Sequence, residues 1–183
     1  MPMNAHALTA LAAAALALAA MPAGAEELHF QAMLSGAAQL PAPTDSKATG
    51  ELKLTVHDGE KKISYTLTVA DLANAYSAEL HLGGPATNGP IVVKLFPARG
   101  ATARKGPYTG VLAEGTITAA DLVGPMLGAT LSDLVYELRD GKTYVNVHTS
   151  DGLNEQPAVP GNYRQGEIRG PIEPRGAAAA PRP

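Results

Sequence analysis

Hydrophobic and polar residues alternate along much of the chain, and this two-residue period is typical of β-strands that turn one face toward a core. The alternation first appears at residues 28–32. It is clearest at 51–57 and 63–69, and the segment between these two runs contains the turn-forming pair Asp58-Gly59. The two runs predict an antiparallel hairpin with one buried face and one solvated face.

Further strands are predicted where alternation, or a short apolar run, is bounded by turn-forming residues. They cover residues 78–82, 91–96, 144–148 and 167–172. The segments between them lack periodicity and are rich in glycine, proline and polar residues. We therefore expect exposed loops at 36–46, 97–110 and 151–165.

Helical signals are short. Thr118 is a good N-cap for a brief helix, which Pro125 limits, and Ser132 is a candidate cap for a second helix that stops at Gly141. With 19 glycines and 15 prolines, the chain favours many turns over a helical bundle. The predicted fold class is all-β: an antiparallel β-sandwich or barrel of short strands with one or two short helices.

The N-terminal segment is typical of a secretory signal peptide. An apolar run from Ala7 to Met21 is followed by the small residues Ala23-Gly24-Ala25, which form a cleavage signal. A helix over this run is about 22 Å long, which is shorter than the roughly 30 Å hydrocarbon layer of a membrane. We therefore expect residues 1–25 to be removed, with Glu26 as the first residue of the mature chain.

This signal sets the predicted domain organisation and location. We expect a β domain at 26–175, a disordered tail at 176–183, and no stable membrane insertion after cleavage. The protein is then extracytoplasmic, either periplasmic or secreted.

Composition excludes several function classes. The 183 residues contain no cysteine, so disulfides, thiolate metal sites and thiol nucleophiles are ruled out. There are 17 acidic residues against 14 lysines and arginines, a net charge of -3, without a basic block. Nucleic acid is therefore not an expected partner.

Several motifs in the chain resemble those of a known family. They are FQAMLSGAAQLP at 30–41, Thr49-Gly50, Asn88-Gly89-Pro90, GTITAADL at 115–122, YVNVHT at 144–149 and GEIRG at 166–170. Together they resemble the CHRD domain, named after chordin, over roughly residues 28–172, and the chain looks like a small secreted bacterial member. One departure is Glu79, because many members carry His-x-His where this chain has Glu79 and His81.

The resemblance implies an all-β extracytoplasmic domain and implies little about activity. We expect a binding or structural module without catalytic activity. It implies no particular ligand, and the expected partner is an extracytoplasmic protein or glycan. Motifs for catalysis are weak: Ser35 lacks a nucleophile-elbow pattern, and Gly83-Gly84-Pro85 has a proline where a phosphate cradle needs N–H donors. A hydrolase is the least favoured alternative, and no cofactor is required.

Six polar residues on three predicted strands carry the candidate chemistry. Because side chains alternate along a strand, the two members of each of three pairs share a face: Glu79 with His81, Asn146 with His148, and Glu167 with Arg169. If the strands are neighbours, the imidazoles and carboxylates of His81, His148, Glu79 and Glu167 are candidate zinc or copper ligands. Asn146 and Arg169 are candidate binding residues.

Two interpretations of these residues remain open. In one, the chain is a periplasmic zinc- or copper-binding protein that uses His81 and His148, whose imidazoles must then lie within roughly 4 Å of each other. In the other, the residues form an ordinary solvated strand face, Glu167 pairs with Arg169 or across to another strand, and His148 only satisfies a loop carbonyl.

Overall fold

The structure is a computed structural model that describes residues 27–57, 59–97, 102–153 and 157–176. The predicted signal peptide, Asp58 and all of the predicted tail except Gly176 lie outside these residues. Its strands are β1 (Leu28–Ser35), β2 (Thr49–His57), β3 (Lys62–Leu82), β4 (Ile91–Phe96), β5 (Arg104–Ile117), β6 (Thr143–Thr149), β7 (Ile168–Pro171) and β8 (Glu173–Pro174). Its helices are α1 (Leu131–Arg139) and the 3-10 turns η1 (Gly36–Ala38), η2 (Ala119–Asp121) and η3 (Gly124–Met126).

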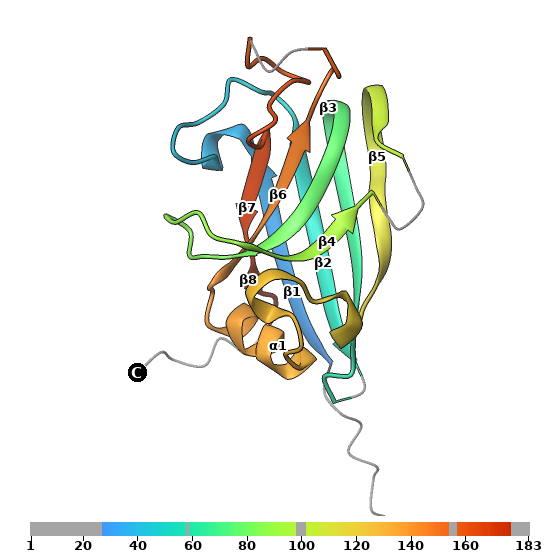
Figure 1. Ribbon diagram of the computed structural model, residues 1–183, viewed down its shortest axis with the longest axis vertical. Coiled ribbons are helices and arrows are strands. Elements are labelled where there is room, and N and C mark those ends of the chain that lie inside the picture. The colour runs from blue at the N-terminus through green and yellow to red at the C-terminus, as the bar shows by residue number, and fades with distance from the viewer. Residues whose placement is uncertain (1–26, 58, 98–101, 154–156, 177–183) are drawn as a thin grey trace, which may run out of the picture.

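The strands form an antiparallel sheet that closes on itself as a small barrel. The order is β2-β1-β7-β6-β3-β4, and β2 also pairs with β3, so the sheet returns to its start. β5 adds to β3, and α1 lies at the opposite end of the barrel from the loops that precede β2 and β7 (Figure 1). The all-β prediction with a short helix is confirmed.

β3 differs from the prediction of two separate strands at 63–69 and 78–82. It runs without a break over 21 residues, with β2 paired to its first half and β6 to its second. Asp71 and Asn74, each with φ of 54°, and shifts of register mark the bend between the halves. Both are residue types that tolerate left-handed backbone, so the strand bends there without ending.

The predicted loop at 97–110 is wrong in its second half. Residues from Arg104 onward belong to β5 and pair with β3, and the Arg104 guanidinium lies 3.9 Å from the centre of the Tyr108 ring. Pro107 and the surrounding glycines are typical of a loop, so the sequence pattern does not indicate a strand here. β5 tolerates them because a strand that pairs along one edge does not need every N–H group.

Both predicted helical segments are helical in the structure, but the first is a 3-10 turn and the second begins at a different residue. α1 is capped by Thr130 and not by Ser132, because Asp133 lies three residues after Thr130 and completes a capping box with it. The expected stop at Gly141 is present, with φ of 66°. The helix predicted after Thr118 is only the 3-10 turn η2.

One face of the strands lines a continuous apolar core. Ala78, Leu80, Val145 and Val147 alternate with the polar residues singled out above and are fully buried against the rest of the core. Leu134 and Leu138 of α1 close one end. Among the residues described, no helix is long and apolar enough to cross a membrane.

Candidate functional site

The six polar residues do lie together on β3, β6 and the start of β7. The register pairs Glu79 with Asn146, and Asn146 with Arg169. We call Glu79, His81, Asn146, His148, Glu167 and Arg169 the polar face. It is not solvated, because loops fold over it: Glu167 and Arg169 are each 1% exposed and Glu79 is 6% exposed. The interpretation of an ordinary solvated strand face is therefore wrong.

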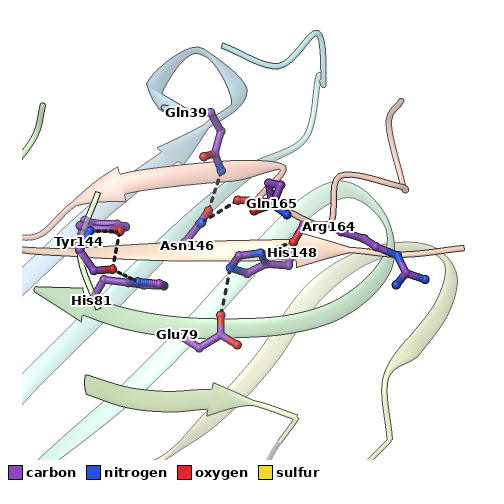
Figure 2. Close-up of polar contacts among 9 residues, drawn as sticks. Gln39, Glu79, His81, Tyr144, Asn146, His148, Arg164 and Gln165 are labelled. Carbon is purple, nitrogen blue, oxygen red and sulfur yellow. Dashed lines mark hydrogen bonds and ion pairs between the residues drawn. The ribbon is translucent and has the colours of Figure 1, made fainter. Parts of the chain in front are cut away.

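Three of these residues form a compact cluster of metal-ligating atoms. One ligand atom each from Glu79, His81 and His148 lies within 4.8 Å of the other two. His148 Nε2 is 3.2 Å from Glu79 Oε2. Figure 2 shows the two side chains facing each other. The imidazole centres of His81 and His148 are 6.4 Å apart. The strand register therefore brings the two histidines together with Glu79. Their ligand atoms, up to 4.8 Å apart, are slightly farther apart than the roughly 4 Å that a shared ion requires.

Backbone carbonyls fix the orientation of both imidazoles. His81 Nδ1 is 2.9 Å from the Gly89 carbonyl oxygen, and His148 Nδ1 is 2.8 Å from that of Arg164. A carbonyl only accepts hydrogen bonds, so each Nδ1 carries a proton. In its neutral form each ring then has the lone pair of Nε2 available to a ligand. The predicted contact of His148 with a loop carbonyl is confirmed.

His81 is held in place by its neighbours. Its ring stacks on Tyr144 at 4.7 Å between centres, and the Arg169 guanidinium lies 3.7 Å from the centre of the same Tyr144 ring. His81 Nε2 is buried and has no hydrogen-bond partner. Burial lowers the pKa of His81 despite the Gly89 carbonyl and the charge of Glu79, so the imidazole is neutral at neutral pH.

His148 behaves differently because it faces Glu79. Burial alone lowers its pKa, but the hydrogen bond and negative charge of Glu79, with the Arg164 carbonyl, outweigh burial and raise the pKa above its ordinary value. When His148 is protonated, its 3.2 Å contact with Glu79 Oε2 is an ion pair. His148 is the most accessible of the three, with 16% of its side chain exposed.

The structure does not bring Glu167 into the cluster. Its carboxylate accepts hydrogen bonds from the hydroxyls of Ser46 and Thr149 and from the amide of Gly161. These contacts fasten two loops to the barrel, and they occupy both oxygens. Glu167 is therefore a loop anchor in this structure rather than a fourth ligand beside Glu79, His81 and His148.

Arg169 and Asn146, the candidate binding residues, are also used internally. The Arg169 guanidinium donates to Asn88 Oδ1 at 2.8 Å and to the carbonyls of Thr87 and Gly84. Asn146 Oδ1 accepts from Gln39 Nε2 at 2.6 Å, beneath the loop that contains η1 (Figure 2). The predicted pairing of Glu167 with Arg169 is not among these contacts.

Sequence reasoning missed a groove on another part of the barrel. It lies between β4 and β5 and has a volume of about 440 Å³. Its walls include Tyr65, Lys94, Glu114 and Asp121. Asp121 belongs to the 115–122 motif, but no motif marks Tyr65, Lys94 or Glu114. β5 itself lacks a clear alternation, and the groove exists only where two strands from different pairings meet.

Comparisons with known proteins agree with the motifs. A search of the curated proteins found no match. The family model of the CHRD domain matches residues 30–172, which is most of the chain and includes most of β1 and all of β2 to β7. The chain therefore belongs to the CHRD domain family.

Proposed function

We propose that this protein is an extracytoplasmic binding module without catalytic activity, and that it recognises an extended segment of a partner protein. The observation that carries the proposal is that the groove between β4 and β5 adjoins an open edge of the sheet. A CHRD domain is an extracellular-type domain, and the predicted signal peptide at 1–25 supports export.

The edge of β5 is suited to strand addition in its second half. In the part of the chain that the structure describes, β5 pairs only with β3. Its first half is protected by Arg104, Lys105 and Pro107, residue types that block pairing with another chain. Its second half, 111–117, carries Glu114 as its single charge and includes four groove-lining residues at 114–117. An extended peptide can pair with such an edge while its side chains enter the groove.

The polar side chains of the groove favour binding of a partner over proton transfer. The Tyr65 hydroxyl donates to the Leu95 carbonyl at 3.0 Å, and Asp121 accepts from the amide and hydroxyl of Thr118. Lys94 and Glu114, both exposed, offer one charge of each sign to a partner. These features support a polar, reversible contact. The open strand edge favours a protein over a glycan as the partner, because a glycan does not pair with a strand edge.

Site-specific photo-cross-linking tests the proposal. A photoreactive residue replaces Lys94 in the groove, with Tyr136 on α1, which is 63% exposed, as the control position. Both proteins are irradiated with the extracytoplasmic fraction of the producing organism. We expect protein adducts at position 94 and not at 136, with loss of the adduct when Val111→Lys adds a charge to the edge.

The matched control is Leu127→Lys, since Leu127 is 78% exposed and lies outside β5. It is expected to leave the adduct unchanged. Equal adducts at both positions, no adduct, or an adduct insensitive to Val111→Lys contradicts the proposal. An adduct of twice the chain mass assigns the edge to a second copy, and a glycan adduct assigns the groove to carbohydrate; either result overturns a partner protein.

A further inference from the structure

Glu79, His81 and His148 converge on one buried point that is separate from the β4–β5 groove. We propose that these three side chains bind a Zn²⁺ ion through Nε2 of each histidine and a carboxylate oxygen of Glu79. Two imidazoles and one carboxylate are a ligand set that zinc accepts, with a fourth coordination position left for water.

The first argument is the orientation of the rings. Both Nδ1 atoms donate to backbone carbonyls, of Gly89 and Arg164. This is the outer-shell contact that metal-ligating histidines usually make, because it fixes the tautomer and aims the other nitrogen at the ion. Two neighbouring histidines from different strands share the arrangement, and Figure 2 shows the contact of His148 Nε2 with Glu79.

The second argument is the presence of buried atoms without hydrogen bonds. His81 is 7% exposed and its Nε2 makes no hydrogen bond, and Glu79 Oε2 makes none either, although it contacts His148 Nε2 at 3.2 Å. Buried polar atoms are nearly always satisfied, so each unsatisfied atom requires an explanation. A cation between these two atoms and His148 Nε2 satisfies all three with one ligand.

The third argument is distance. Ligand atoms about 2.1 Å from a four-coordinate zinc ion lie roughly 3.4 Å from one another. The three atoms here lie within 4.8 Å of one another, so each has to move inward by less than about 1 Å. Small rotations of the side chains supply such a shift, and the backbone of β3 and β6 stays in register.

The surroundings hold the site in shape. Tyr144 stacks on His81, and its hydroxyl is bonded to Gly89, the same residue that orients His81. Arg169 lies beyond Tyr144, and its positive charge is engaged by three oxygen acceptors of the 84–88 turn. Glu79 supplies the negative charge nearest the point of convergence.

Calorimetry and NMR of the untagged, chelator-treated protein titrated with zinc chloride test this inference. We expect one Zn²⁺ per chain, and perturbation of the His81 and His148 imidazole resonances with coordination at Nε2. His81→Gln and His148→Gln are each expected to weaken binding at least about 100-fold, and Glu79→Gln about 10-fold or more. His29→Gln is the matched control, since His29 is exposed and bonded to Thr55, and it leaves binding unchanged.

The inference is overturned if zinc does not bind stoichiometrically. It is also overturned if the imidazoles that shift are those of His29 or His57, or if His29→Gln weakens binding as much as His81→Gln. Where a glutamine variant does not fold, as judged by circular dichroism, the resonances of the unsubstituted protein decide the question. The groove cross-linking uses different residues, so either result stands without the other.

Discussion

The carboxylate of Glu167 accepts a hydrogen bond from the hydroxyl of Ser46 at 2.6 Å, although 121 residues separate them in the chain. This contact fastens the loop between β1 and β2 to the residue that precedes β7. The same carboxylate holds Gly161 of the 150–166 loop. One buried side chain therefore fixes two of the segments that cover the polar face.

Removal of the Glu167 carboxylate is expected to destabilise the fold. Glu167→Ala leaves the donors of Ser46, Thr149 and Gly161 without an acceptor, and we expect a loss of about 3 kcal/mol in the free energy of unfolding. Glu167→Gln keeps the size and one accepting oxygen, so its loss is smaller. Urea denaturation measures both, and hydrogen exchange is expected to accelerate at Gly161.

The control for this prediction is the exposed Glu173, whose replacement by alanine is expected to change stability by less than about 0.5 kcal/mol. Equal stability of Glu167→Ala and Glu173→Ala contradicts the anchoring role.

Arg169→Lys is a second test of the loop anchors. A lysine ammonium cannot reproduce the planar contacts of the guanidinium with Asn88, Thr87 and the Tyr144 ring. We expect a loss of about 2 kcal/mol in the free energy of unfolding, and faster hydrogen exchange at Thr87, whose amide closes the turn onto Gly84.

Arg139→Lys provides the comparison, because Arg139 is half-exposed and pairs with Glu60 at the surface. Its change is expected to stay within about 0.5 kcal/mol. If the two substitutions lower the free energy of unfolding equally, Arg169 does not hold the 84–88 turn.

The raised pKa of Tyr65 leads us to expect a loss of stability at alkaline pH. Burial, and secondly the charge of Asp121, raise the pKa of Tyr65 in the folded protein. The stabilisation from the neutral phenol is therefore complete below pH about 10 and is lost as the pH rises through the folded-state pKa, because only the unfolded chain ionises freely.

Tyr65→Phe removes this titration together with the bond to the Leu95 carbonyl. We expect the unsubstituted protein to be more stable than the variant by about 1 kcal/mol at pH 8, and this advantage to disappear by pH 11. Urea denaturation at both values measures it, with Tyr136→Phe on the exposed face of α1 as the control. An advantage that is constant with pH refutes the prediction.

The mature N-terminus is a further prediction. If residues 1–25 are a signal peptide, the protein exported by a bacterial host begins at Glu26. Intact-mass measurement of the extracytoplasmic fraction checks this. A protein that keeps Met1 and stays with the membrane fraction contradicts both the cleavage and the proposed location.

Local patterns in the sequence were sufficient for much of the fold. The alternation at 51–57 and 63–69 predicted the β2–β3 hairpin, and Gly141 predicted the end of α1. The alternation at 78–82 and 144–148 predicted that Glu79 shares a strand face with His81, and Asn146 with His148. These features depend on residues a few positions apart, so the chain itself specifies them.

Only the tertiary structure decided that β3 continues through Asp71 and Asn74, that β5 begins at Arg104, and that loops cover the polar face. It also decided which polar residues meet: His81 and His148 lie beside Glu79, whereas Glu167 is drawn to Ser46. The physical reason is that alternation fixes the face on which a side chain lies. Its neighbours and its burial depend on strand pairing and loop closure between residues far apart in the chain, such as His81 with His148 and Ser46 with Glu167.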